Sequence, residues 1–314
     1  MPADNASNPC ESAMNPSTDP YDVIVVGGSY AGMSAALQLA RARRRVLVID
    51  SGEPRNEPAA HSHGFLGQDG QPPEQISARA RAELLAYPSV SWHQGRAKQA
   101  RAMTDRFQID CASGERFVAD RLVLAHGVRD ELPDIEGIAE RWGRSVFHCP
   151  YCHGYELNGG RIGVIACSSD GADQQALLLS DWGEVTLFCD EDEDGPEAAI
   201  GQRLAERGVA VERARVRRVC DKATVELVDG RQRVMDGLFI SPPQRLASPL
   251  AKQLGCALED GGCITTDAAK QTTVDGVFAC GDAARMAGSI ALAVGEGALA
   301  GVAAHRSLLG LLER

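Results

Sequence analysis

The chain has 314 residues, of which 44% are hydrophobic and 24% are charged, and its formal net charge is −11 at pH 7. This length and composition predict a globular protein large enough for two domains of ordinary size. The negative charge argues against nucleic acid and against an anionic membrane surface as partners, because both attract basic proteins. The sequence also contains no apolar run near the roughly 20 residues that a transmembrane helix requires.

The first 20 residues are rich in Asn, Ser, Pro and Asp, and they contain neither a basic start nor an apolar segment. A secretory signal peptide has both features, so we interpret residues 1–20 as a disordered leader and expect a cytoplasmic protein. Most of the ten cysteines should then be reduced thiols, buried as small apolar side chains.

A strand, a glycine-rich turn, a helix and a second strand follow the leader. Residues 21–26 are continuously apolar, which is typical of a parallel strand buried on both faces. The turn Gly27–Gly32 comes next, and an apolar helical periodicity covers residues 33–41. The second buried strand, at 45–50, ends in an acid. This order is the fingerprint of a dinucleotide-binding Rossmann unit.

Each part of the fingerprint has a physical role. Gly27 forms the turn, Gly32 allows helix and strand to pack closely, and Asp50 reaches a ribose hydroxyl, while the helix N-terminus faces a pyrophosphate. Ser29 replaces the middle glycine, a mild departure because serine is small and donates a hydrogen bond. The alternative is a tight Rossmann turn that binds nothing. The predicted cofactor contacts here are Gly27, Ser29, Tyr30, Ala31, Gly32, Asp50 and Ser51.

A second half of a cofactor site lies near the other end of the chain. A short buried strand runs into Gly281 and Asp282, and a helix rich in small residues covers 288–301. The acid can accept from a ribityl hydroxyl, and the helix can direct its positive end at a flavin ring. Small residues allow close approach to the ring and to a neighbouring strand, so we expect both chain ends to bind one FAD. The predicted contacts on this side are Gly281, Asp282, Ser289, Ile290 and Ala291, with Gly127 at the end of a buried strand over 120–127.

The segment 56–75 is rich in Gly and Pro, which marks a loop too long to be a passive connection. Loops of this kind usually line sites. His61 and His63 are candidate proton carriers or flavin neighbours, with hydrogen-bonded loop anchors as the alternative, and we include His61 among the cofactor contacts. A helix over 76–86 and a small antiparallel meander follow. The meander strands are predicted at 90–93, 97–103, 106–111 and 116–118.

The middle of the chain repeats the Rossmann pattern. The predicted fold is therefore α/β, with two Rossmann-like three-layer domains, the second inserted in the first. The FAD domain comprises 21–141 and 243–314, and the inserted domain comprises 142–242. The elements predicted in the inserted domain are strands at 160–166 and 185–189, helices at 173–182 and 198–206, and a strand from Val209.

The inserted domain lacks the sequence features that usually bind a dinucleotide. The turn after its first strand, 167–171, has one glycine where two or three are wanted, and the next strand ends in the acidic run Asp190–Asp194. Five carboxylates would repel the 2′-phosphate of NADPH, whereas the alternative interpretation is an exposed, solvated loop. Both interpretations remove the usual NADPH site, so NADPH is doubtful as a cofactor.

Two cysteines, Cys149 and Cys152, lie between His148 and His153. A Cys-x-x-Cys pair is redox-active or is half of a zinc site, and the other eight cysteines lie singly. The redox interpretation is therefore favoured, and no metal is expected. Both histidines are of a residue type suited to proton transfer near neutral pH, with packing at a strand end as the alternative role of His148.

The glycine turn, the cysteine pair that opens the inserted domain and Gly281-Asp282 resemble the low-molecular-weight thioredoxin reductase family. The resemblance covers about residues 21–312, and it implies FAD in the outer domain, NADPH in the inserted domain and a homodimer. It also implies that Cys152 lies next to the flavin and that Cys149 exchanges with the substrate. The position after the second cysteine is usually an aspartate that acts as an acid, whereas here it is His153.

The longer motif Cys-Pro-Tyr-Cys-His-Gly-Tyr-Glu is similar to a branch of that family that includes the dithiol oxidases of gliotoxin- and holomycin-type natural products. That resemblance implies electron flow from a substrate dithiol to the enzyme disulfide, to FAD and to oxygen, without NADPH. We therefore predict a FAD-dependent thiol–disulfide oxidoreductase that oxidises a small-molecule dithiol or a protein thiol. The alternatives are an NAD(P)H- or ferredoxin-dependent disulfide reductase and a flavin-bound redox sensor without turnover.

Overall fold

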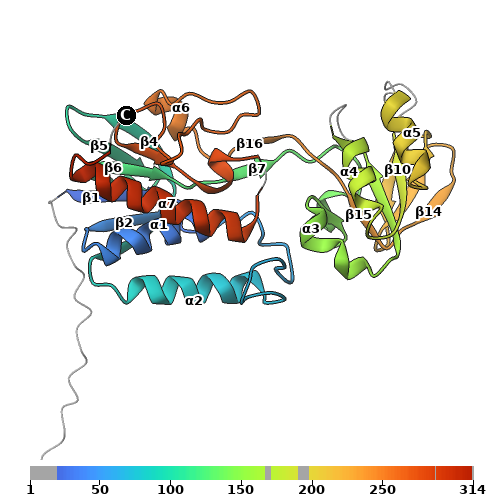
Figure 1. Ribbon diagram of the computed structural model, residues 1–314, viewed down its shortest axis with the longest axis horizontal. Helices are drawn as coiled ribbons and strands as arrows, with labels where there is room; N and C mark the ends of the chain where they lie inside the picture. The colour runs from blue at the N-terminus through green and yellow to red at the C-terminus, as the bar shows by residue number, and fades with distance from the viewer. Residues whose placement is uncertain (1–19, 167–170, 190–197, 287, 313–314) are drawn as a thin grey trace, which may run out of the picture.

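The structure of the chain is a computed structural model that describes residues 20–166, 171–189, 198–286 and 288–312. The predictions for the leader, for most of the turn at 167–171 and for the acidic run at 190–194 lie outside these ranges. The described residues form two lobes, each with its own main sheet, joined by two crossing segments (Figure 1). They contain no helix that is both long and apolar enough to span a membrane.

The main sheet of the first lobe has seven strands. They are β1 (Tyr21–Val26), β2 (Val46–Asp50), β3 (Val90–Gln94), β4 (Ala97–Ala102), β5 (Phe107–Cys111), β6 (Arg116–Leu124) and β17 (Val277–Ala279). Their order is β3-β2-β1-β6-β5-β4, and β17 also pairs with β6. Val25 pairs in parallel with Val48 on one side and with Val123 on the other, so β1 is central and buried on both faces, as predicted.

The predicted four-stranded meander is partly wrong. Strand β3 pairs in parallel with β2, because helix α2 (Pro73–Leu85) forms a crossover between them and prevents a hairpin with β4. The strands predicted at 116–118 and 120–127 are one continuous strand, β6, which pairs with β5 through its first half and with β1 through its second. The antiparallel part of the sheet is therefore β4, β5 and β6 alone.

Helices α1 (Tyr30–Arg41) and α7 (Ile290–Leu308) lie together on one face of this sheet (Figure 1). A Cβ at Gly297 would meet the backbone carbonyl of Ala31, and a Cβ at Gly301 would meet that of Ala35. The two helices therefore touch backbone to backbone. The small residues of α7 were predicted to approach a flavin ring and a strand, whereas in the structure they allow this contact with a helix.

The second lobe has three layers, as predicted for a Rossmann-like unit. A five-stranded parallel sheet in the order β11-β10-β9-β15-β8 lies between helices on one face and a three-stranded antiparallel sheet on the other. The parallel strands are β8 (Val146–Phe147), β9 (Arg161–Ile165), β10 (Glu184–Phe188), β11 (Ala210–Glu212) and β15 (Gly237–Phe239). The covering elements are helices α4 (Ala172–Leu179) and α5 (Ala198–Glu206) and strands β12 (Val216–Cys220), β13 (Thr224–Leu227) and β14 (Gln232–Val234).

Strands β7 (Val128–Asp130) and β16 (Gln244–Leu246) pair antiparallel where the chain leaves the first lobe and returns to it. We propose two domains, with 21–141 and 243–314 as one domain and 142–242 as the other, although Ile138 already packs in the core of the second lobe. The remaining short elements are helices α3 (Pro150–His153) and α6 (Leu250–Leu254) and the single turns η1 (Ala139–Arg141), η2 (Tyr155–Leu157) and η3 (Gly281–Ala284).

Substitution by alanine should change the free energy of unfolding in opposite directions at two glycines of α7. Gly297→Ala places a Cβ against the Ala31 carbonyl and should lower the free energy of unfolding by about 1–3 kcal/mol. Gly295→Ala meets no atom within 4 Å and should raise it by roughly 0.5–1 kcal/mol, because alanine favours a helix over glycine. Thermal unfolding of the FAD-loaded protein measures both changes. Equal changes in the unfolding temperature of the two variants would contradict the backbone contact between α1 and α7.

Candidate active site

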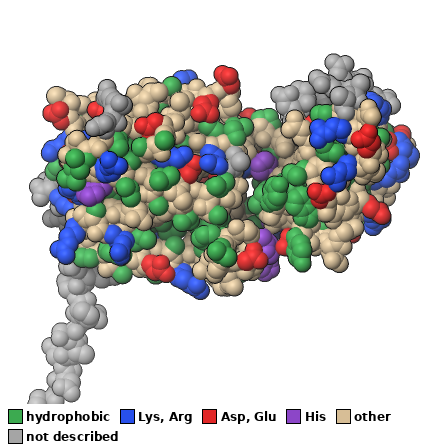
Figure 2. Space-filling view, viewed as in Figure 1, with side chains coloured by type: hydrophobic (Ala, Val, Ile, Leu, Met, Phe, Trp, Pro, Cys, Tyr) green, Lys and Arg blue, Asp and Glu red, His purple; other side chains and the backbone are tan. Residues whose placement is uncertain are grey.

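A cavity of about 870 Å³ joins the first lobe to the near face of the second. It is lined by the glycine turns from both ends of the chain and by the cysteine pair. Figure 2 shows histidine and apolar side chains where the two lobes meet. The predicted site residues that line the cavity are Gly27, Ser29, Tyr30, Ala31, Asp50, Ser51, His61, Gly127, His148, Cys149, Cys152, His153, Gly281, Asp282, Ser289 and Ile290.

The first glycine turn needs glycine for steric reasons. Gly27 has a φ of +106°, and a Cβ there would meet the Ala125 carbonyl. The Gly28 N–H donates to Asp50 Oδ1 at 2.9 Å, which ties the turn to the end of β2. Ser29 is the N-cap of α1, but its side chain makes no capping hydrogen bond. The first N–H groups of α1 are therefore without a side-chain cap beside the cavity, which suits an anionic group.

Two predicted cofactor contacts lie off the cavity wall. Gly32 packs against the Gly27 carbonyl, which is its predicted packing role. Ala291 is exposed in the first turn of α7, and Ala293 lines the cavity in its place. Ser289 lines the cavity and also caps α7, because its Oγ accepts a hydrogen bond from the first turn at 3.1 Å.

Arg55 links both sides of the cavity and was not singled out from the sequence. Its Nε and Nη2 donate to the Asp130 carboxylate at 2.8 and 2.6 Å, and its Nη1 donates to Asp282 at 2.8 Å. Burial alone lowers the pKa of Arg55, but the hydrogen bonds and charges of the two carboxylates outweigh burial and raise it. The one sequence signal was its position beside the loop predicted to line a site.

Three buried polar atoms of the cavity wall, His126 Nε2, His148 Nδ1 and Ser248 Oγ, have no partner among the described residues. His126 Nδ1 lies 3.1 Å from the Gly127 carbonyl, so Nδ1 carries the proton and Nε2 is an acceptor. Burial lowers the pKa of His126 to about 4, and the ring is neutral at pH 7. A cofactor with hydroxyl, amide and phosphate groups, as in FAD, fits these atoms and the uncapped end of α1.

Cys149 and Cys152 form a disulfide with their Cα atoms 5.3 Å apart. Cys149 is the N-cap of α3, and Pro150 occupies the first helical position, where its missing N–H has no intrahelical partner to lose. Both cysteines are half-buried and line the cavity. The disulfide is therefore open to attack by a thiolate that enters the cavity.

His148 and His153 flank the disulfide. Burial lowers the pKa of His148, the Arg55 charge lowers it further, and its Nδ1 is buried without a partner among the described residues. Burial also lowers the pKa of His153, with the Glu156 charge opposing that shift. The His153 ring stacks on Phe147, with ring centroids 4.3 Å apart. Both imidazoles are therefore neutral near pH 7 and can accept a proton from a thiol.

Cys111, Cys256, Cys263 and Cys280 are buried thiols outside the disulfide. Burial raises the pKa of Cys280 to about 12 and that of Cys111 to about 11, so these thiols stay protonated and unreactive. The described part of the chain contains no group of three or more His, Cys, Asp or Glu placed to hold a metal ion.

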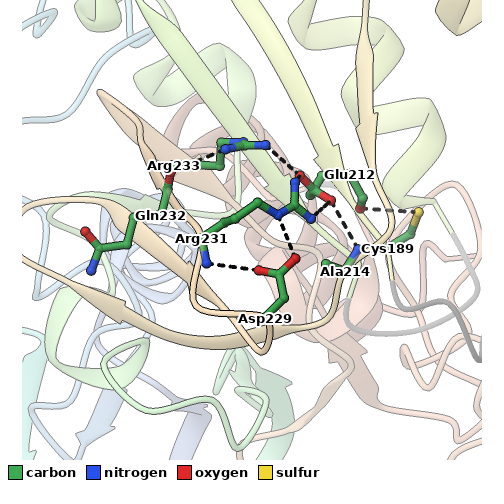
Figure 3. A network of polar contacts seen from close by, with 7 residues as sticks. All are labelled: Cys189, Glu212, Ala214, Asp229, Arg231, Gln232 and Arg233. Atoms are coloured by element: carbon green, nitrogen blue, oxygen red, sulfur yellow. Dashed lines mark hydrogen bonds and ion pairs between the residues drawn. The ribbon is translucent and has the colours of Figure 1, made fainter.

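A second cavity, of about 360 Å³, lies at the carboxyl ends of β9 and β10, where a Rossmann unit binds its nucleotide. Beside it, Glu212 accepts from Arg231 at 2.8 and 2.9 Å and from Arg233 at 3.0 Å (Figure 3). Asp229 accepts from Arg231 as well, at 2.6 Å. In this network two guanidinium groups face two carboxylates, so it offers a phosphate no net positive charge.

Comparison with known families matches residues 21–297 to the pyridine nucleotide-disulphide oxidoreductases. The chain belongs to this family. It is a thioredoxin reductase-like flavin disulfide oxidoreductase, its cofactor is FAD, and the predicted family and fold class are confirmed.

Similar proteins include two fungal ones named as thioredoxin reductases. The protein tcpT of Claviceps purpurea (strain 20.1) is 32% identical, over 92% of this chain and 94% of its own length. The protein sirT of Leptosphaeria maculans is 30% identical, over 92% of this chain and 95% of its own.

Two solved structures are also similar. An oxidoreductase from Agrobacterium tumefaciens is 53% identical with a TM-score of 0.90, over 93% of this chain and 99% of its own. The structure of HlmI is 36% identical with a TM-score of 0.87, over 93% of each chain.

The glycine turn predicts a sharp effect on FAD retention. Gly27→Ala should reduce the FAD-to-protein ratio strongly, because the new Cβ meets the Ala125 carbonyl and moves the turn. Gly114→Ala is the matched control, with a similar φ of +103° but no atom within 4 Å of the new Cβ. The ratio is measured from the flavin and protein absorbance of the purified variants. A full FAD load in Gly27→Ala would show that this turn does not hold the cofactor.

Proposed function

We propose that the chain oxidises a dithiol to a disulfide through Cys149–Cys152 and FAD, with oxygen or another acceptor taking the electrons. The observation that carries the proposal is that the disulfide and both cofactor turns line one cavity. A thiol substrate and a flavin can therefore both reach the cysteine pair without another protein carrier. The resemblance of the motif at 149–156 to dithiol oxidases supports the oxidative direction.

In the proposed reaction, a substrate thiolate attacks the Cys149 sulfur and Cys152 leaves as a thiolate, which gives a mixed disulfide. The second substrate thiol then attacks the substrate sulfur of that bond, and the substrate leaves as a disulfide. Two electrons and two protons have moved from the substrate to the cysteine pair. FAD supplies the route by which these electrons leave for oxygen, which becomes hydrogen peroxide. The roles of the two cysteines follow the thioredoxin reductase likeness.

His153 and His148 are the proposed bases for the substrate thiols. Both line the cavity beside the disulfide, and burial lowers both pKa values, so their unprotonated forms dominate near neutral pH. Stacking on Phe147 fixes the plane of the His153 ring, which supports a directed proton transfer.

The competing function is reduction of a disulfide by NAD(P)H, which the names of the two fungal relatives favour. The charge balance of the Glu212 network argues against it, because Arg231 and Arg233 are matched by carboxylates. A dinucleotide 2′-phosphate needs cationic partners, and the Glu212 network supplies none in excess. The second cavity itself is lined by Arg215 and Arg217, and Arg217 pairs with Glu226 at 3.2 Å.

We further propose a cytoplasmic homodimer that acts on a small-molecule dithiol or a protein thiol. Three apolar side chains spaced along α7, Leu292, Leu299 and Val302, are 40%, 53% and 46% exposed, which suits burial against a second copy. Light scattering that gives the mass of a single chain would contradict the dimer.

Anaerobic mixing separates the oxidase from the reductase. Dithiothreitol should bleach the flavin absorbance of the wild-type protein, and NADPH and NADH should bleach it far more slowly. Cys149→Ser is the control that should keep FAD but lose bleaching by dithiothreitol, because its disulfide cannot form. Rapid bleaching by NADPH would overturn the oxidative direction. In a separate aerobic assay with dithiothreitol, oxygen uptake that stops after one turnover would favour a sensor.

Removal of the His153 imidazole should slow thiol oxidation without loss of FAD. His153→Gln should lower kcat/KM for dithiothreitol by about 10²–10⁴-fold, the usual value of general-base help. Since burial lowers the pKa of His153, the base form persists as pH falls, and the wild-type rate should decline only below the range of an ordinary histidine. His305→Gln, near the end of α7, is the matched control. An unchanged rate in His153→Gln would exclude it as the base.

A further inference from the structure

A row of acid–base side chains leads away from the disulfide. His63 Nε2 lies 3.4 Å from Glu156 Oε1, and His63 Nδ1 lies 3.7 Å from Asp69 Oδ1. Asp69 is held in place by the Gly64 N–H, which donates to its Oδ1 at 2.8 Å. Glu156 follows His153 by three residues, and its charge acts on the His153 ring. We call His153, Glu156, His63 and Asp69 the acid–base row.

The acid–base row crosses between the two lobes. His63 belongs to the loop between β2 and α2 of the first lobe, whereas Glu156 lies in η2 of the second. His63 lines the cavity with the disulfide, and His61 lies beside it with ring centroids 6.5 Å apart. The long loop therefore places a titratable side chain against η2, the turn that follows the cysteine-bearing helix α3, which a passive connection would not require.

Exposure is greatest at the Asp69 end of the acid–base row. The His63 side chain is 23% exposed, the Glu156 side chain 40% and the Asp69 side chain 69%. His153 is itself half-buried and stacked on Phe147, so it needs a partner to return its proton to water. A base that cannot release its proton between turnovers stops working after one cycle.

We propose that Glu156 and His63 are positioning residues that carry the proton of the substrate thiol from His153 to solvent. The proposal rests on the proposed dithiol oxidation and deepens it. The substrate S–H bond breaks, its proton binds a ring nitrogen of His153, and it then passes through the Glu156 carboxylate and the His63 imidazole to water near Asp69. No electron moves in these steps, and each group of the acid–base row returns to its starting protonation state.

Anaerobic reduction by dithiothreitol, followed by flavin bleaching across a pH series, tests the proposal. Glu156→Gln and His63→Ala should each slow bleaching by about tenfold, a part of the general-base effect, with normal FAD content. Added imidazole should restore the rate of His63→Ala, because it replaces the lost proton carrier. The matched controls, Glu140→Gln and His305→Gln, lie outside the cavity and should react as the wild type does.

The titration of His153 gives a second readout that does not depend on turnover. The Glu156 charge raises the pKa of His153 and the His63 charge lowers it, so Glu156→Gln should lower this pKa further and move the acidic limb of the bleaching rate to lower pH. Proton NMR of the imidazole rings measures the midpoint. An unchanged His153 midpoint in Glu156→Gln would separate the two side chains and overturn the row as a proton path.

The outcomes distinguish the two proposals. If dithiothreitol does not bleach the wild-type protein, the dithiol oxidation fails and the proton path fails with it. If the wild type is bleached and the Glu156→Gln and His63→Ala variants match it at every pH, only the proton path is overturned. The variants could also react more slowly than the wild type by the same factor at every pH, without recovery in added imidazole. That result would show that the His63–Glu156 pair only holds the two lobes together, and it would also overturn the path.

Discussion

The contact between helices α1 and α7 decides whether the cofactor site exists. The two helices come from opposite ends of the chain, and Gly297 and Gly301 let α7 rest on the backbone of α1. The contact places the start of α7 beside the first glycine turn and so brings Asp50 and Asp282 to one cavity. Close-packed helices cannot accept an added carbon without a shift, so this contact couples the packing of the first lobe directly to its chemistry.

A buried carboxylate, that of Glu296, ties the Gly281 turn to helix α7. Glu296 on α7 is 5% exposed and accepts from Lys270 Nζ at 2.6 Å, from Arg285 Nε at 2.9 Å and from the Gly281 N–H at 3.1 Å. A buried carboxylate is tolerated only with such partners, and removal of one of them leaves an uncompensated charge. The Gly281 turn is therefore tied to α7 electrostatically, which keeps the neighbouring Asp282 on the cavity wall.

Much of the fold and of the candidate site could be predicted because it is encoded in local patterns, such as the glycine turn and the spacing of the cysteines. The partner of strand β3 could not be predicted, although the strand itself was, because the polarity of residues 90–94 suits a meander while the crossover through α2 selects β2. Arg55 and Asp130 are 75 positions apart, and no local pattern connects them. His126 stood next to the predicted Gly127, but its unpartnered nitrogen exists only in the folded chain.

The direction of electron flow depends on where charge lies, because reductases and oxidases of this family share one fold. A reductase must hold an anionic dinucleotide and deliver protons to a disulfide, whereas an oxidase must take protons from thiols. His148 and His153 are neutral by burial and suit proton removal, and Arg231 is held by Glu212 rather than left for a phosphate. The histidines and the arginine network belong to different elements of the second lobe and have unrelated physical causes. Their agreement therefore gives the proposed oxidation two independent arguments.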